Sequence, residues 1–294
     1  MAGRFGTVLT AMATPFLPDG GLDLPGAERL ADHLVANGSD GLVVAGSTGE
    51  APTLRHEEKD ALFRAVVGAV GGRANVLCGT GTNDTAESIE LTRLAAGAGA
   101  DGLLLVTPYY NRPPQRALIE HFRAVAGAAD LPTMLYNVPG RTATRIEHAT
   151  LLALLGTSNI VAVKDSTGDL QAASRLAADM PSGTDLYCGD DWAALAMACL
   201  GAVGVVSVAS HLVGPSIARM FAHVVAGRIA DARAIHRELT PVFDALFVTS
   251  NPIPLKAALD ALGLPGGPPR PPLQPATDGE RATIAEALRG VGLG

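Results

Sequence analysis

A single lysine stands at the point where an apolar strand is expected to end. In NIVAVKDSTGD, residues 159–169, the run from Ile160 to Val163 is typical of a buried strand, and Lys164 follows it directly. An amine that is partly removed from water can act as a nucleophile, and with a carbonyl compound it forms a Schiff base. The alternative is a lysine that extends to solvent or pairs with Asp165.

Hydroxyl groups follow two other apolar runs. GSTGE, residues 46–50, places Ser47 and Thr48 between glycines, where consecutive backbone N–H groups can form a nest for an anion. TPYYNRPPQ, residues 107–115, places Tyr109 and Tyr110 after a further run. The alternatives are a Ser/Thr turn that begins a helix and a tyrosine pair that only packs.

The stretch LYNVPGRT, residues 135–142, supplies a phenol and a guanidinium group. Tyr136 follows an apolar run, so we expect its ring to be buried and its hydroxyl to have a partner. Arg141 lies on the loop beyond, and a guanidinium group suits bidentate binding of a carboxylate, with an ordinary surface arginine as the alternative.

Eight short apolar runs position these residues and alternate with longer Ala/Leu-rich segments. The runs are 7–12, 41–46, 75–80, 102–107, 133–137, 160–164, 185–189 and 204–208. They are continuous rather than alternating, as expected for strands that are covered on both faces. Eight strand–helix units predict an α/β fold of the (β/α)8 (TIM) barrel type, with a doubly wound sheet as the alternative. In a barrel the residues that follow each strand share one mouth, where active sites lie.

The pattern changes after about residue 227. Segments 228–248, 252–264 and 278–292 have helical patterning, and six of the eleven residues from 265 to 275 are proline, which is typical of an extended chain. We therefore predict a barrel domain over residues 1–227 and a C-terminal α-helical domain over residues 228–294.

Composition excludes several classes of function. The 294 residues are 48% hydrophobic and carry a net charge of -7, which argues against a nucleic-acid partner because such proteins need a basic patch. The seven histidines are scattered, so no metal site is expected. Three cysteines without a C-x-x-C spacing, and no apolar run of membrane-spanning length, predict a cytoplasmic protein without a membrane partner.

Five motifs occur in order over nearly the whole chain: GSTGE, TPYYNRP, YNVPGRT, VKDSTGD and NPIPLKAAL. Together they resemble the dihydrodipicolinate synthase (4-hydroxy-tetrahydrodipicolinate synthase) family. This family is one of the pyruvate-dependent aldolases that act through a lysine imine, a superfamily that also contains N-acetylneuraminate lyase. The resemblance implies a homotetrameric (dimer of dimers) lyase of diaminopimelate and lysine biosynthesis that condenses pyruvate with L-aspartate 4-semialdehyde and needs neither a metal nor an organic cofactor.

The resemblance also implies a role for individual residues. By the family pattern Lys164 forms the imine, and Ser47, Tyr110 and Tyr136 relay protons, with Tyr110 reaching in from a neighbouring subunit. The substrate-binding positions of the family correspond to Thr48 (pyruvate carboxylate, through its backbone), Arg141 (semialdehyde carboxylate), and Gly189 and Val206 (pocket lining).

Two departures from the family pattern leave alternatives open. Ser47 stands where the synthases usually have threonine and the neuraminate lyases often have serine, whereas Arg141 fits the synthases, so a lyase-like or sugar-acid aldolase is the alternative function. A non-catalytic ligand-binding barrel is a further alternative. A lysine feedback site is implied at His56, Asn83, Glu87 and Tyr109. Lys59 and Ala51 replace a histidine and a serine that are common there, so regulation by lysine stays open.

Overall fold

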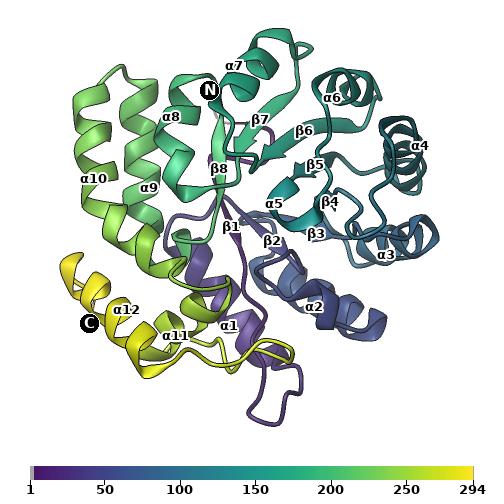
Figure 1. Ribbon diagram of the computed structural model, residues 1–294. Helices are drawn as coiled ribbons and strands as arrows, with labels where there is room; N and C mark the ends of the chain where they lie inside the picture. Colours follow the sequence, from purple (N-terminus) through teal and green to yellow (C-terminus); the bar gives the residue numbers. More distant parts are fainter. Residues whose placement is uncertain (1–2, 294) are drawn as a thin grey trace.

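The computed structural model describes residues 3–293, and in it eight parallel strands close into a barrel in which each strand pairs with the next along the chain (Figure 1). The strands are β1 (Val8–Ala11), β2 (Gly41–Val44), β3 (Asn75–Gly79), β4 (Gly102–Val106), β5 (Thr133–Asn137), β6 (Ile160–Asp165), β7 (Asp185–Cys188) and β8 (Gly204–Ser207). The pairing of β8 with β1 completes the circle. The predicted (β/α)8 barrel is confirmed, and the doubly wound sheet is excluded.

Helices surround the barrel and also form the C-terminal part of the chain (Figure 1). The α-helices are α1 (Leu24–Ala36), α2 (His56–Val70), α3 (Thr85–Gly97), α4 (Gln115–Ala126), α5 (Pro139–Thr142), α6 (His148–Leu155), α7 (Leu170–Asp179), α8 (Ala194–Cys199), α9 (Ser210–Val225), α10 (Ile229–Leu246), α11 (Ile253–Ala261) and α12 (Asp278–Gly290). Two short 3-10 helices, η1 (Ala51–Thr53) and η2 (Asp191–Ala193), follow β2 and β7.

Each strand contributes side chains to two separate apolar cores. In β5, Met134 and Tyr136 belong to a cluster inside the barrel, whereas Leu135 belongs to the larger cluster between the barrel and its helices. Alternate residues of a strand face opposite sides of the sheet, and both sides are covered here. This double burial explains why the strands are continuous apolar runs in the sequence.

The interior of the barrel is closed at the amino ends of the strands. Phe5 and Tyr187 are almost fully buried there and belong to the inner cluster. The Tyr187 hydroxyl accepts a hydrogen bond from the Phe5 N–H (3.2 Å) and donates one to the Gly6 carbonyl (3.0 Å). Any cavity in the barrel axis must therefore open at the other end, where the carboxyl ends of the strands lie.

The chain leaves the barrel through α9 and continues into three further helices. α10 packs against α9, and α12 packs against both α10 and α11. The segment 265–275 contains neither a helix nor a strand, as the prolines predicted. The division into domains at residues 227 and 228 falls in the turn between α9 and α10 and stays a prediction. Among residues 3–293, no helix is long and apolar enough to cross a bilayer.

Candidate active site

Lys164 lies beside Tyr136 at the carboxyl end of the barrel. β5 and β6 pair in a register that sets these two residues directly opposite each other. The Lys164 Nζ atom lies 4.0 Å from the centroid of the Tyr136 ring, and the lysine is only 5% exposed. An amine so enclosed does not extend to solvent, which removes one of the alternatives raised by the sequence. β6 continues one residue further than predicted, through Asp165.

Asp165 does not pair with Lys164. Within the described part of the chain no ion pair joins them. The Asp165 carboxylate instead accepts hydrogen bonds from the Thr167 N–H (2.8 Å) and hydroxyl (2.7 Å). Burial raises the pKa of Asp165, and the two Thr167 donors oppose that rise. The second alternative for Lys164 is therefore also excluded, and its amine is available to a ligand.

A cavity of about 340 Å³ opens beside Lys164. Strand residues, residues of the loops that follow the strands, and two residues of the C-terminal part line it: Ala11, Val43, Gly46, Ser47, Thr48, Leu104, Tyr136, Val138, Arg141, Lys164, Ser166, Gly189, Asp190, Trp192, Val206, Val208, Phe247 and Asn251. Seven of the residues predicted from the sequence thus share one cavity. They are Ser47, Thr48, Tyr136, Arg141, Lys164, Gly189 and Val206. The volume suits a small substrate rather than a polymer.

Gly189 allows the chain after β7 to pass close to Lys164. A Cβ atom at this position would lie 2.8 Å from the Lys164 Cε atom and 2.0 Å from the Ser166 hydroxyl oxygen. No side chain fits there unless Ser166 and Lys164 move, so the glycine leaves the room in which the amine stands. The buried Ser166 hydroxyl has no hydrogen-bond partner within the described structure and lines the same cavity.

The loop from Gly46 to Glu50 brings Ser47 and Thr48 to the cavity. Ala45 precedes the loop and Glu50 ends it, and both have left-handed backbone conformations, with φ of 51° and 54°. The Thr14 hydroxyl donates to the Gly49 carbonyl (2.7 Å). Strained residues of this kind persist only where the surrounding structure holds them, and they concentrate at functional sites.

Arg141 belongs to a single helical turn, α5, rather than to the loop that the sequence predicted. The segment that contains α5 is closed by the Asn137 side chain, which donates to the Ile146 carbonyl (3.0 Å) and accepts from the Ile146 N–H (3.0 Å). The guanidinium group is exposed and lines the cavity, so it lies where it can bind an anion that enters.

Tyr110 is the predicted catalytic residue that the chain does not bring into its own cavity. Its side chain is 89% exposed, and its backbone is left-handed with φ of 71°. The Asn111 side chain secures this turn by donating to the Asn83 carbonyl (2.9 Å). An exposed tyrosine on a strained turn is compatible with the predicted contact to a neighbouring subunit, which stays a prediction.

The sequence predicted seven of the eighteen residues that line the cavity, and among the other eleven are five with polar or aromatic side chains. They are Ser166, Asp190, Trp192, Phe247 and Asn251. Ser166 and Asp190 lie within two residues of predicted site residues, so their position after a strand was a usable signal. Phe247 and Asn251 come from the C-terminal part. Asn251 begins the motif NPIPLKAAL, but that motif by itself does not place the region at the barrel mouth.

Three of the four residues of the implied lysine site, His56, Glu87 and Tyr109, lie close together outside the cavity. His56 Nε2 lies 3.0 Å from Glu87 Oε1, and Lys59 is buried close enough to Glu87 for their charges to interact. Burial lowers the pKa of Lys59, and the charge of Glu87 opposes that change. Burial also raises the pKa of Tyr109, and Glu87 adds to that rise. The structure therefore brings together the predicted residues of α2 and α3 with Tyr109.

The fold and the cavity define the class of the protein: a (β/α)8-barrel enzyme with its chemistry at the carboxyl ends of the strands. A sequence profile described as the dihydrodipicolinate synthetase family matches residues 4–290. The chain belongs to this family. The resemblance found in the motifs is confirmed, and the non-catalytic barrel is excluded.

Individual relatives support this conclusion at high coverage. The chain is 53% identical over 290 residues to the 4-hydroxy-tetrahydrodipicolinate synthase of Moorella thermoacetica, covering 99% of both chains. It is similar to a crystal structure of the synthase from Cyanidioschyzon merolae with lysine bound, at 47% identity, 99% coverage of both chains and a TM-score of 0.97. It is also similar to the Acinetobacter baumannii synthase complexed with pyruvate, at 36% identity, a TM-score of 0.95, and coverage of 99% of this chain and 100% of that one.

Proposed function

We propose that this enzyme condenses pyruvate with L-aspartate 4-semialdehyde through an imine between pyruvate and Lys164. The observation that carries the proposal is the enclosed Lys164 amine, unpaired with Asp165 and 4.0 Å from the centre of the Tyr136 ring, inside a cavity of small-substrate size. The family relationship supports the same pair of substrates, because the relatives are named as synthases of 4-hydroxy-tetrahydrodipicolinate.

The reaction begins when the neutral Lys164 amine attacks the ketone carbon of pyruvate and water leaves. The resulting iminium withdraws electrons, so a proton can leave the methyl group and an enamine forms. The Tyr136 phenol carries protons at this stage, and Ser47 and Tyr110 connect it with solvent. The enamine carbon then attacks the aldehyde, and the amine of the semialdehyde displaces Lys164 to close the ring.

Two anchors orient the substrates for these steps. The backbone at Thr48 holds the pyruvate carboxylate in the nest formed by the loop, and the Arg141 guanidinium group holds the carboxylate of the semialdehyde. Both residues line the cavity that contains Lys164. Fixing both partners converts an encounter of two molecules into a reaction within one complex, which is a large part of catalysis.

Borohydride trapping tests the proposal directly. Protein incubated with pyruvate and borohydride should gain the mass of one reduced pyruvate on the peptide that contains Lys164, and the Lys164→Ala variant should gain none. An unmodified wild-type peptide would eliminate imine chemistry. A coupled assay with aspartate semialdehyde and a sugar-acid aldehyde then decides the acceptor, and we expect turnover only with the semialdehyde because the relatives are named as 4-hydroxy-tetrahydrodipicolinate synthases.

We further propose that the cluster around His56, Asn83, Glu87 and Tyr109 is the counterpart of the implied lysine site, with Lys59 limiting its affinity. The buried Lys59 ammonium already interacts with Glu87, the carboxylate that an incoming ammonium group would need. Lysine should therefore inhibit weakly, and Lys59→His should increase inhibition by about tenfold or more. Equal inhibition curves for both proteins would reject this role of Lys59.

Cellular location, oligomeric state and cofactor requirement are proposed from the resemblance to the family. We place the enzyme in the cytoplasm as a homotetramer that needs no metal or organic cofactor. Dialysis against a chelator should leave turnover unchanged, and a mass measurement in solution should give four chains. If dialysis abolishes activity and a divalent metal restores it, the enzyme does need a metal.

A further inference from the structure

The loop from Gly46 to Glu50 is held in place by a distant part of the chain. The Asn251 side chain donates from Nδ2 to the Thr48 hydroxyl oxygen at 2.9 Å, across 203 positions of sequence. At the end of the same loop, Glu50 Oε1 lies 2.6 Å from Lys256 Nζ on α11. The loop is therefore connected at two points with the segment that contains α11.

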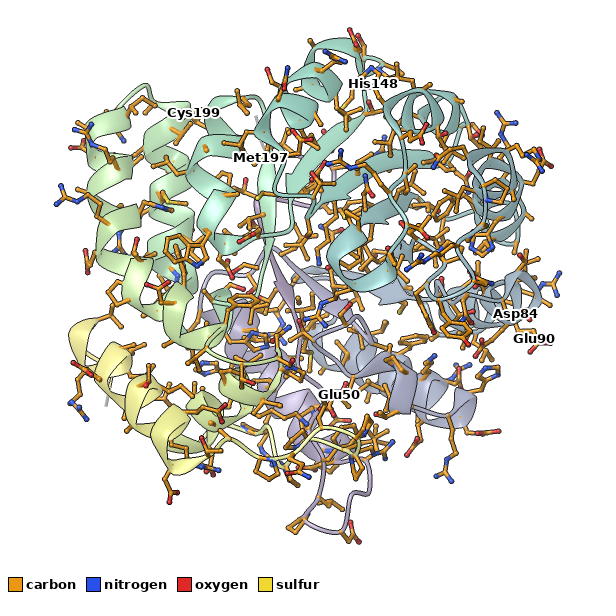
Figure 2. The ribbon with its side chains drawn as sticks, in the orientation of Figure 1. Glu50, Asp84, Glu90, His148, Met197 and Cys199 are labelled. Carbon is orange, nitrogen blue, oxygen red and sulfur yellow. The ribbon has the colours of Figure 1, made fainter. Side chains whose placement is uncertain are left out.

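The Glu50–Lys256 pair is buried, with side-chain exposures of 1% and 2%. Glu50 Oε2 also accepts from the Arg270 N–H at 2.8 Å, and Lys256 Nζ donates to the Pro268 carbonyl at 3.0 Å. Lys256 lies 4.3 Å above the ring centre of Phe16. Figure 2 shows Glu50 near the C-terminal part of the ribbon. Burying two charges adds little net stability, so a buried pair of this kind is better explained by what it positions.

The side-chain contacts of Glu50 hold its backbone in an unfavourable conformation. Its φ of 54° is unfavourable for a residue with a Cβ atom, and the same holds for Ala45 at the start of the loop, with φ of 51°. The side-chain contacts of Glu50 supply interactions that are lost if the loop relaxes to an ordinary conformation. Since Ser47 and Thr48 lie between these two residues, the conformation of the whole loop depends on both ends.

We propose that Glu50 and Lys256 are positioning residues for pyruvate. Their ion pair holds the loop so that the groups of Ser47 and Thr48 face the pyruvate carboxylate, and it makes the segment from 251 to 270 part of the binding machinery. This inference rests on the proposed function, because it assigns the loop to pyruvate.

The Lys256→Met variant tests this role. It removes the ammonium group at similar volume and leaves the buried Glu50 carboxylate without its ion-pair partner, with only the Arg270 N–H still bound to it. The carboxylate should then move toward water and displace the loop. We expect the KM for pyruvate, and the pyruvate concentration that half-saturates borohydride trapping, to rise by about tenfold or more. The kcat at saturating pyruvate should change by less than about threefold, because bound pyruvate restores the loop.

Two controls separate positioning from general stability. Ile284→Ala destabilises the C-terminal helices through α12, where Ile284 is 2% exposed, without touching the loop. It should lower the melting temperature and leave the pyruvate KM unchanged. If Lys256→Met does not fold, the double variant Glu50→Gln/Lys256→Met removes both charges, and its pyruvate KM should still rise by about threefold because the ionic anchor is gone.

The outcomes distinguish this inference from the proposed function. A wild-type protein that forms no adduct with pyruvate would reject the proposed function itself. A wild-type adduct together with an unchanged pyruvate KM in Lys256→Met, or in the double variant, would reject the positioning role alone. An equal rise of the pyruvate KM in Ile284→Ala would reject it as well, because any loosening of the C-terminal helices would then suffice.

Discussion

At the scale of single residues, the site depends on how closely the chain approaches Lys164. The amine is fixed by Tyr136 opposite it in the neighbouring strand and by Gly189, whose missing side chain leaves room for it. The sequence predicted the three residues, but only the structure gives the reason for the glycine, because that reason is a distance between chain segments that are far apart in sequence.

Gly189→Ala should therefore impair imine formation. The added methyl group would lie 2.0 Å from the Ser166 hydroxyl oxygen and 2.8 Å from Lys164 Cε, so both side chains must move. A displacement of the amine by about 1 Å costs on the order of a hundredfold in rate. Single-turnover borohydride trapping measures this step. Gly68→Ala, at a helix position with no atom within 4 Å of the new methyl group, is the control and should trap pyruvate at the wild-type rate.

Arg141→Ala should affect the second substrate and spare the first. A hydrogen bond to a charged group contributes about 1.5–3 kcal/mol, so kcat/KM for the semialdehyde should fall by roughly 10- to 150-fold while pyruvate trapping stays unchanged. Arg145→Ala is the matched control, because Arg145 is an exposed arginine that pairs with Asp169 at 3.1 Å and does not line the cavity. Unchanged semialdehyde kinetics in Arg141→Ala would reject the assignment of this residue.

At the scale of elements, the strands were predictable and the short connections were not. All eight strands lie where the apolar runs placed them, because burial on both faces gives each strand a continuous apolar run in the sequence. The single turn α5 was not predicted, since Pro139 and Gly140 resemble a loop and the turn is closed by Asn137 from outside it. Phe247 and Asn251 were missed because only folding brings the connection between α10 and α11 to the barrel mouth.

His211 of α9 connects this helix with the segments that follow β1 and β8, and makes their contact sensitive to pH. The Ala13 N–H donates to Nε2 at 3.1 Å, and Nδ1 donates to the Val208 carbonyl at 2.8 Å, so the ring must be neutral. Burial lowers the pKa of His211 to about 4, below the ordinary value of 6.5. As the pH falls through this window the unfolded chain takes up a proton first, so stability that is present above pH 6.5 is lost toward pH 4.

This linkage should cost about 3 kcal/mol of the free energy of unfolding between pH 7.5 and pH 4. Denaturant unfolding at several pH values measures it, and His211→Gln should be less stable at pH 7.5 but should lose less on acidification. Phe221→Leu, in the same helix α9, is a control with a comparable loss at neutral pH and should keep the wild-type slope. Parallel curves for wild type and His211→Gln would exclude His211 as the source.

At the scale of the whole molecule, the cavity of one chain lacks one predicted member of the proton relay. Ser47 and Tyr136 line it, whereas Tyr110 is 89% exposed and stands on a turn with φ of 71°. Exposing an aromatic ring to water and holding its backbone in a left-handed conformation both cost free energy. Strain of this kind is found where function requires it. We therefore expect Tyr110 to complete the cavity of a second copy, in a symmetric pair in which each chain serves the other.

Mixing two inactive variants tests this arrangement. The Tyr110→Phe chain keeps Lys164 but lacks the hydroxyl that would complete the proton relay of its partner. The Lys164→Ala chain keeps Tyr110 but cannot form the imine. If Tyr110 acts across the interface, a mixed pair contains one site with both groups. Random reassembly of equal amounts should then restore about a quarter of the wild-type sites, because half of the pairs are mixed and half of their sites are complete. If Tyr110 acts within its own chain, every site in the mixture lacks one group and no activity returns, so the recovered fraction decides between the two arrangements.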